Sequence, residues 1–398
     1  MRTIPITKAI FDEEEKSAIV KPLETGWIVQ GPNVKNFEQQ FANFINSPHA
    51  KAVSNCTTAL HLGLDALGIG VGDKVVVPSF TYVASANAVT YTGAEVVFCD
   101  IDLATFNIDV KQLENLLQKD PAIKAVMPVH LFGLCADMPA IMKLAEQYEL
   151  FIIEDAACGF DSWLNDQHAG TFGDVGCFSF HPRKAITTGE GGMLVTGQDR
   201  LFETVSQLCD HGAAKSDLTR HKEKGGSLLP DFSLRGFNYR MTDFQGALGV
   251  CQMAKADRIM AGRRGVAQQY QEALANFEPL ILPSEPKGYR HGYQSFVCLF
   301  TEGKSIEQLT MDNAIELNQK RNQWMQLLEE KGIATRQGTH AVHALSYYAK
   351  RYQLKDDMYP ASWMADRLSV TLPVYADMTA DEFDYVIDEM QRAYQCVA

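Results

Sequence analysis

Short apolar runs alternate with longer segments of helical periodicity between residue 51 and about residue 245. The apolar runs, which predict strands, are 51–54, 74–78, 95–100, 125–129 and 150–155. The periodic segments, which predict helices, are 58–67, 83–92, 109–118 and 139–148. Strands that are hydrophobic on both faces are typical of a mostly parallel sheet covered by helices. The pattern therefore predicts a large three-layer α/β domain, with its ligand site beyond the carboxyl ends of the strands.

The later part of the chain has a different pattern of hydrophobic and polar residues. A long helix is predicted over 243–276, followed by an alternating segment at 295–300 and periodic helices at 315–331 and 381–394. The last of these begins with the capping signature Thr379-Ala380-Asp381-Glu382. We predict a large domain over 1–246 and a smaller α+β domain over 247–398. The best candidate for a mobile loop is 223–227, which contains two glycines and a serine.

Composition narrows the class of protein. The 398 residues are 46% hydrophobic and 21% charged, as expected of a globular enzyme. A net charge of -13 argues against a nucleic-acid or anionic-membrane partner, and there is no apolar run long enough to span a bilayer. The nine cysteines include no C-x-x-C pair, which argues against a zinc site and fits a reducing compartment. The first residues lack the apolar core of a signal peptide, so we expect a cytoplasmic protein.

Lys184 is the first candidate for chemistry. It lies in a turn rich in glycine and hydroxyl groups, between the predicted strands 176–180 and 193–196. A lysine in such a place is either a solvated loop charge or a nucleophile held over a cofactor. Desolvation or a neighbouring cation makes a lysine nucleophilic by lowering its pKa. Hydroxyl donors around it are supplied by Ser179, Thr187 and Thr188.

Two further segments stand at predicted strand ends. The first, 54–60, runs into a helix, where the free N–H groups could bind an anion; simple capping by Ser54 or Thr57 is the alternative. The second contains Asp155, whose buried carboxylate needs a cationic partner such as a protonated pyridine nitrogen, unless it only caps a helix. The glycines at 68–72 follow a helix and precede a strand, so they are no dinucleotide fingerprint.

Other residues allow both a functional and a structural interpretation. Tyr82 could stack on a flat ring or belong to the core. Asn238 and Arg240 could be polar contacts or surface residues. His340 and His343 could contact a ligand or be structural histidines.

Taken together, the segments resemble the DegT-type (StrS-type) sugar aminotransferases, which are enzymes of the aspartate aminotransferase fold, type I, and use pyridoxal 5′-phosphate (PLP). The resemblance covers nearly the whole chain. The most specific string is Phe178-Ser-Phe-His-x-x-Lys184-x-x-Thr-Thr-Gly-Glu-Gly-Gly192. It is accompanied by the segments 25–32, 54–60, 78–82, 129–133, 154–157, 236–241 and 372–375.

The resemblance implies roles for the matching residues. Lys184 forms the Schiff base with PLP and moves the proton as general acid and base. Asp155 pairs with the pyridinium nitrogen, and Tyr82 lies against the ring. The N–H groups of Thr57 and Thr58, with the hydroxyls of Thr57 and Ser179, hold the phosphate.

Asn238 is expected to reach the phosphate from the neighbouring subunit, which makes the active unit a homodimer with a shared site. The chain departs from the family at two positions. Cys158 stands where many members have glutamine near the cofactor hydroxyl, and Cys56 where many have glycine. Cys158 is therefore expected to be a weak cofactor contact.

The expected reaction has two halves. L-glutamate converts PLP to pyridoxamine phosphate (PMP), and PMP then aminates a nucleotide-linked 4-keto-6-deoxy sugar or a 3-keto sugar. Relatives that remove a sugar hydroxyl instead have histidine in place of the lysine, whereas this chain keeps Lys184. Candidate contacts to the sugar nucleotide are Trp27 and its loop (27–32), His340 and His343. Candidate anion partners are Arg183, Arg240 and Arg336.

Two alternatives remain from the sequence. The same lysine chemistry would serve a cyclitol or another keto substrate without a nucleotide. A regulatory or scaffolding protein could keep the fold without turnover, although a scaffold has no physical need for Lys184, Asp155 and Ser179 together.

Overall fold

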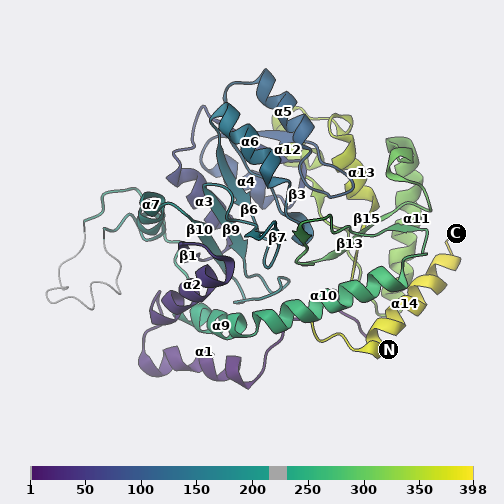
Figure 1. The fold of residues 1–398 in the computed structure, drawn as a ribbon, viewed down its shortest axis with the longest axis horizontal. Helices are drawn as coiled ribbons and strands as arrows, with labels where there is room; N and C mark the ends of the chain where they lie inside the picture. The colour runs from purple at the N-terminus through teal and green to yellow at the C-terminus, as the bar shows by residue number, and fades with distance from the viewer. Residues whose placement is uncertain (1, 215–230, 398) are drawn as a thin grey trace.

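The apolar runs of the first half of the chain pair into one sheet in this computed structural model, which describes residues 2–214 and 231–397. The seven strands follow the order β1 (His49–Val53), β10 (Gly192–Thr196), β9 (Val175–Ser179), β6 (Phe151–Asp155), β5 (Ile123–Val126), β2 (Lys74–Pro78) and β4 (Glu95–Cys99). Only β10 runs against its two neighbours; the other pairs are parallel. The prediction of a mostly parallel sheet is confirmed (Figure 1).

Helices cover both faces of this sheet, which makes three layers (Figure 1). One layer contains α3 (Cys56–Ala66), α4 (Ala84–Tyr91) and α7 (Asp199–Cys209). The opposite layer contains α2 (Pro32–Ile45), α5 (Val110–Lys119) and α6 (Met138–Tyr148). Val75 and Val77 pack into the first layer and Val76 into the second, because successive strand side chains point to opposite faces. Burial on both sides explains the uninterrupted apolar runs.

The last third of the chain builds a smaller antiparallel sheet. It consists of β11 (Leu280–Ile281), β13 (Phe296–Phe300) and β15 (Ser369–Leu372), with the helices α11 (Met311–Glu330), α13 (Pro360–Leu368) and α14 (Ala380–Gln395) around it. The capping box predicted at Thr379 is present at the start of α14. Ile4 bridges to Ile333 and is buried in this core, so the first residues lie against the last part of the chain. The division at residue 246 stays a prediction.

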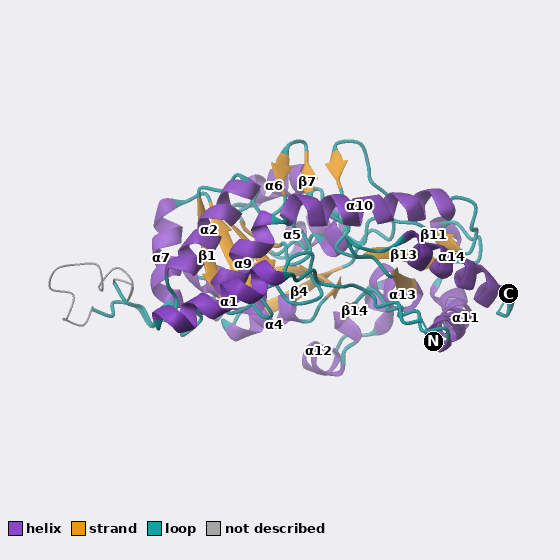
Figure 2. Cartoon of the chain, turned by 90° about the horizontal axis from the view of Figure 1, so that it is seen from below, coloured by secondary structure: helices purple, strands orange, loops and turns teal. Residues whose placement is uncertain are grey.

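The single helix predicted over 243–276 is two helices. α9 (Asp243–Ala254) ends at its C-cap Lys255 (φ −105, ψ 0), and α10 (Ala256–Ala273) follows directly. In Figures 1 and 2, α10 runs along the molecule from the large sheet to the small one. The predicted loop at 223–227 lies outside the described residues.

Short strands tie the last part of the chain to the ends of the large sheet. β14 (His340–Ala341) pairs with β3 (Phe80–Thr81), and α12 (Ser346–Tyr352) follows it. β12 (Tyr289–Arg290) pairs with β7 (Trp163–Leu164), which also pairs with β8 (Gln167–His168). These pairings place residues from both halves around the carboxyl ends of the central strands.

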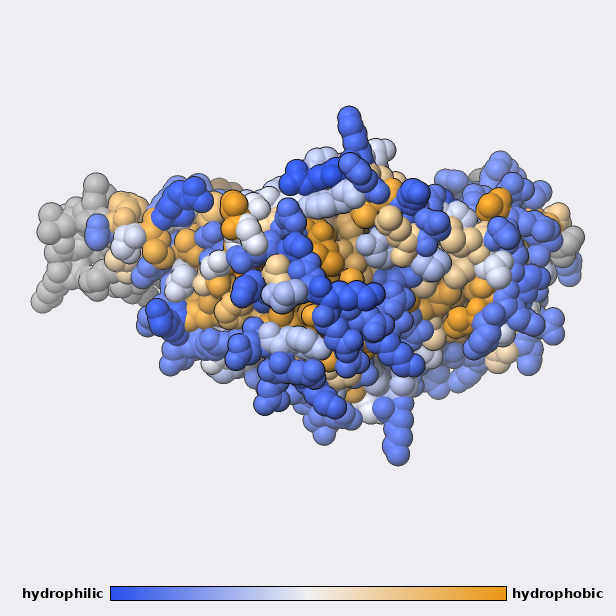
Figure 3. Space-filling model, turned by 90° about the horizontal axis from the view of Figure 1, so that it is seen from above, coloured by the Kyte–Doolittle hydropathy of each residue, from blue (hydrophilic) through white to orange (hydrophobic). Residues whose placement is uncertain are grey.

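One face of the molecule is shown by residue hydropathy in Figure 3. On the face shown in Figure 3, hydrophilic residues cover most of the area and hydrophobic residues gather in the hollows between them. Among the described residues, no helix is both long enough and apolar enough to cross a membrane.

Lys255 fastens the N-terminal helix α1 (Glu13–Thr25) to the break between α9 and α10. Its ammonium lies 2.5 Å from an Asp12 carboxylate oxygen and 2.7 Å from one of Glu15. Asp12 caps α1, and its contact with Lys255 lowers its pKa to about 2. Glu15 is buried, and among the described residues Lys255 is its one cationic partner, beside hydrogen bonds from Gln252 and the Asp12 N–H.

We predict that Lys255→Met lowers the melting temperature by several degrees, because it leaves Glu15 as a buried carboxylate without its cation. Thermal unfolding followed by circular dichroism measures the effect, and Lys16→Met, which removes an exposed partner of Glu13, is the matched control. The difference between wild type and Lys255→Met should shrink as the pH falls from about 4 to about 2, since Asp12, whose pKa is lowered by its contact with Lys255, becomes protonated. Equal melting temperatures at pH 7 would contradict this role.

Candidate functional site

A cavity of about 900 Å³ lies at the carboxyl ends of the large sheet. One side is built by the strand ends and by the start of α3; the other side comes from residues 6–7, 294–295 and 336–340. Eight of the residues predicted to act in the site line it: Thr57, Thr58, Tyr82, Asp155, Cys158, Ser179, Lys184 and His340. The fold therefore brings together predicted residues that are up to 283 positions apart (from 57 to 340).

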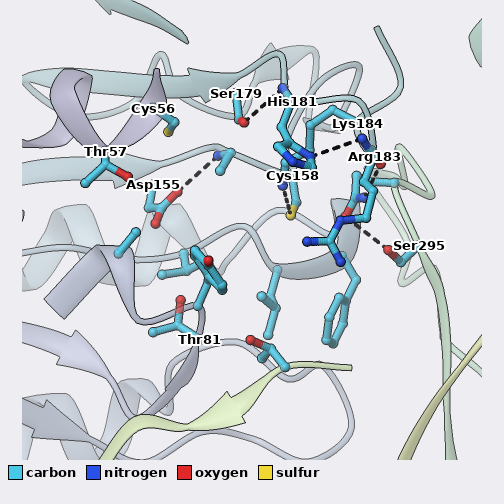
Figure 4. Close-up of a pocket in the computed structure, with 18 of the residues that line it drawn as sticks. Cys56, Thr57, Thr81, Asp155, Cys158, Ser179, His181, Arg183, Lys184 and Ser295 are labelled. Carbon is cyan, nitrogen blue, oxygen red and sulfur yellow. Dashed lines mark hydrogen bonds between the residues drawn. The ribbon is translucent and has the colours of Figure 1, made fainter. Parts of the chain in front are cut away.

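Lys184 points into the cavity from the loop between β9 and β10 (Figure 4). Its backbone N–H donates to the carbonyl of His181 at 2.8 Å, which closes a turn and leaves the side chain free to reach inward. The amine Nζ lies 3.2 Å from the sulfur of Cys158. Burial lowers the pKa of the Lys184 amine, but the adjacent Cys158 and the carboxylate of Asp155 outweigh burial and raise the pKa above its ordinary value of 10.5. The lowered pKa expected of a nucleophilic lysine is not found, so the amine must lose a proton before it can attack.

The hydroxyls of Thr187 and Thr188 do not surround the Lys184 amine as predicted. Thr187 Oγ1 donates to the carbonyl of Phe180 at 2.8 Å, and Thr188 Oγ1 donates to that of Glu190 at 2.7 Å. Both are buried and hold the loop in shape. Gly192 is required where the loop passes α3, since a Cβ there would lie 2.4 Å from the carbonyl carbon of Asn55.

The start of α3 offers free backbone donors to the cavity. Asn55 caps the helix, rather than Ser54 or Thr57, and its side chain accepts from the N–H of Thr58 at 2.9 Å. The predicted phosphate contact through the Thr58 N–H is therefore corrected, because that group already has a partner. The N–H groups of Cys56 and Thr57 have no acceptor within the described parts of the chain. Two such groups at a helix start, beside the Thr57 and Ser179 hydroxyls, suit a phosphate.

Asp155 ends β6 with its carboxylate in the cavity and only 4% of the residue exposed. One oxygen accepts from Ser85 Oγ at 2.7 Å and the other from the N–H of Ala157 at 3.1 Å. The segment after Asp155 is a turn and not a helix, so Asp155 is no helix cap. Neither hydrogen-bond partner is charged, and the carboxylate can still accept a cation such as a protonated pyridine.

The sequence interpretation missed Glu154, the buried carboxylate next to Asp155 in the chain. Glu154, on the opposite face of β6, accepts from the backbone N–H groups of residues 170, 172 and 173, each at 2.7 Å. His130 Nε2 lies 2.8 Å from the same carboxylate, while His130 Nδ1 accepts from the N–H of Ala136. A signal was present: adjacent residues of a strand face opposite ways, so Glu154 and Asp155 could not serve the same site. No sequence pattern of this kind indicated that Ser85 would bind Asp155.

Several predicted residues lie outside the cavity. His343 is buried, with Nδ1 2.6 Å from Ser79 Oγ, so it is a structural histidine and its predicted substrate contact is corrected. Arg240 forms an ion pair with Asp210, away from the cavity. Trp27 does not line the cavity either; its indole N–H lies 3.3 Å from the carbonyl of Gln30. Asn238 is exposed and does not reach the cavity of its own chain.

The outer part of the cavity contains the remaining candidates. Tyr82 is 64% exposed and lines the cavity, as does His340, so neither belongs to the core. Arg183 and Arg336 also line the cavity, and neither is ion-paired with any residue that the structure describes. Of the three arginines that the sequence proposed as anion partners, these two are therefore free to bind an anion in the cavity. Within residues 2–214 and 231–397, no group of three or more metal-binding side chains occurs.

The arrangement fits PLP. Lys184 offers an amine, Asp155 a carboxylate, and α3 two free N–H groups, all within one cavity. Cys56, where the family often has glycine, is buried, and burial raises its pKa well above the ordinary value, so its thiol is neutral and adds no charge against a phosphate.

Comparison with known proteins gives a consistent result. The sequence model of the DegT/DnrJ/EryC1/StrS aminotransferase family matches residues 9–391. The chain is 37% identical to the GDP-perosamine synthase of Caulobacter vibrioides over 392 residues, covering 98% of each chain. It is 34% identical to the spore coat polysaccharide biosynthesis protein SpsC of Bacillus subtilis over 389 residues, covering 98% of this chain and 96% of that one. The fold matches the PMP form of the putative sugar aminotransferase Spr1654 from Streptococcus pneumoniae (TM-score 0.89, 24% identity, 100% of both chains).

We predict that PLP binds to the Lys184 amine faster as the pH rises, without a plateau below 10.5, because only the neutral amine attacks and its pKa is raised. Adding PLP to the apoprotein and recording the absorbance near 400 nm measures this rate. Lys184→Ala should give no such band, while Lys111→Ala, at an exposed position, is the control. A plateau already at about pH 8 would mean that the pKa is lowered.

Proposed function

Because the chain belongs to the DegT/DnrJ/EryC1/StrS aminotransferase family, we propose that it transfers the amino group of L-glutamate to the keto carbon of a nucleotide-linked 4-keto-6-deoxy or 3-keto sugar. It is a PLP-dependent aminotransferase. The observation that carries the proposal is the placement of Lys184, Asp155 and the free start of α3 around one cavity that has room for much more than the cofactor.

Bound PLP supplies an aldehyde that takes up an amine and a ring that withdraws electrons from the neighbouring carbon. Lys184 would hold the cofactor and then carry the proton at its amine between donor carbon and cofactor carbon. Asp155, fixed by Ser85, would keep the ring nitrogen protonated. Thr57 and Ser179, with the N–H groups of Cys56 and Thr57, would bind the phosphate. Cys158, 3.2 Å from the Lys184 amine, would lie beside the cofactor hydroxyl as a weak partner.

The wall opposite these residues supports a sugar nucleotide. It carries neutral hydrogen-bonding side chains, which suit sugar hydroxyls: Thr7, Gln294, Ser295, Gln337, Thr339 and Thr371. Arg183 and Arg336 lie in the same cavity and suit a diphosphate. GDP-perosamine synthase, to which the chain is 37% identical, bears the name of a nucleotide-sugar product. We propose that this chain also aminates a nucleotide-linked keto sugar, without specifying which sugar.

A homodimer would complete the site. Asn238 is exposed, stands outside its own cavity and is available to a neighbouring subunit. Exposed apolar side chains gather on α1 and the loop after it: Ile19, Val20, Leu23, Ile28 and Val29. A stretch of this kind is typical of a surface that another chain covers.

We predict that L-glutamate bleaches the PLP absorbance of the wild type, and that a nucleotide-linked keto sugar restores it. The panel of acceptors contains 4-keto-6-deoxy and 3-keto sugars linked to GDP, UDP or dTDP, and cyclitol ketones without a nucleotide. Amination of a cyclitol ketone but of no sugar nucleotide would favour the alternative substrate class. PLP binding without turnover of any donor would instead favour a scaffolding protein.

We predict that two inactive variants restore activity when combined. In a mixed dimer of Lys184→Ala and Asn238→Ala subunits, one site contains both substitutions and the other contains neither, provided that Asn238 acts across the interface. Co-expression with two affinity tags, sequential purification and an activity assay test this. If Asn238 acts within its own chain, both sites are damaged and the mixed dimer stays inactive.

A further inference from the structure

Arg263, in α10, is a buried cation without an anionic partner. Only 1% of the residue is exposed, and none of the acidic side chains that the structure describes forms an ion pair with it. The neighbouring Arg264 differs, since it is paired with Asp161. Burial alone lowers the pKa of Arg263 to about 10, which leaves it charged at neutral pH. A buried charge without a counter-charge lowers the stability of the fold, because its desolvation is not repaid by an ion pair.

The donors of Arg263 all go to neutral oxygens behind the cavity. Nε and Nη2 donate to the carbonyl of Tyr293 at 3.2 and 3.0 Å, and Nη2 also donates to that of Gln294 at 2.6 Å. Nη1 donates to Thr7 Oγ1 at 3.2 Å. Thr7, Gln294 and the adjacent Ser295 line the cavity. Tyr293 has a positive φ of 43, which is unfavourable for a bulky residue, so the turn needs such a clamp.

The clamp continues to the lysine loop. The side-chain amide of Gln294 donates to the carbonyl of Arg183 at 3.1 Å, directly before Lys184 in the chain. Arg263 and Arg183 are thus joined through one glutamine, with one guanidinium behind the wall and the other in the cavity. The lining contains two acidic residues, Asp155 and Glu190, and Asp155 is the proposed partner of the cofactor.

We propose that Arg263 is a positioning residue of an anion-selective wall: its forked donors hold Thr7, Tyr293 and Gln294, and its charge favours a ligand with a diphosphate or two carboxylates beside Arg183. The proposal rests on the proposed function, because it assumes that this wall faces the substrate. The anionic group of the ligand then supplies the negative charge that Arg263 lacks among its protein partners.

Binding of probe anions to the PLP-loaded protein tests the proposal by calorimetry, without turnover. The probes are GDP, UDP, dTDP, inorganic pyrophosphate and glutarate. We expect Arg263→Met to weaken the binding of the nucleoside diphosphate by about tenfold or more, and Arg263→Lys, which keeps the charge, to weaken it less. Gln294→Ala should weaken it as well, and it serves as the second variant if Arg263→Met does not fold. Arg264→Met, the neighbouring guanidinium, should stay within about twofold of wild type.

The outcomes separate this proposal from the proposed function. Arg263→Met or Gln294→Ala with unchanged affinity and only a lowered melting temperature would mean a structural role and overturn the proposal. If the wild type binds glutarate but no nucleoside diphosphate, the sugar-nucleotide proposal fails, and Arg263 is then judged by the same ranking of variants with glutarate. If the wild type binds none of the anions, the anion-selective wall is refuted.

Discussion

The site depends on two adjacent carboxylates at the end of β6 that face opposite ways. Glu154 points into the protein, where three backbone N–H groups and His130 satisfy it. Asp155 points into the cavity, and its own backbone is held by the chain after β5, through His130 and Pro128. A buried carboxylate is tolerated only with such a set of partners. Because Glu154 fastens the surrounding loops, Asp155 can remain without a charged protein partner and receive one from the cofactor.

The same distribution of charge recurs on a larger scale. The protein is acidic as a whole, yet two arginines that line the cavity, Arg183 and Arg336, lack carboxylate partners in the described structure. Two other cations are ion-paired where they hold elements together: Lys255 with Asp12 and Glu15, and Arg264 with Asp161. The buried Arg321 instead donates to neutral oxygens of Asn322 and Ser369 and does not line the cavity. Unpaired cations that line a cavity are a physical mark of a binding site.

Much of this protein was predictable from its pattern of residues. The strands and helices of the large sheet lie within a few residues of the predicted ranges, because burial on both faces leaves an uninterrupted apolar run. The order of the motifs also placed Lys184, Asp155 and Thr57 at strand ends, and the cavity joins them. The single helix predicted over 243–276 is interrupted at Lys255, whose side chain binds carboxylates of Asp12 and Glu15, more than 200 positions earlier.

The sequence by itself determined the order of strands and helices, the family and the residues that can carry PLP chemistry, because these follow from local periodicity and from residue types at fixed spacing. Only the tertiary structure decided which side chains meet. His343 binds Ser79 and Arg240 pairs with Asp210, so neither lies in the cavity. The Thr58 N–H donates to Asn55, and the hydroxyls of Thr187 and Thr188 donate to backbone carbonyls of their own loop. It also revealed Ser85, Glu154 and Arg263, whose roles come from contacts with residues distant in the chain. Such contacts depend on how elements pack, and no local pattern encodes them.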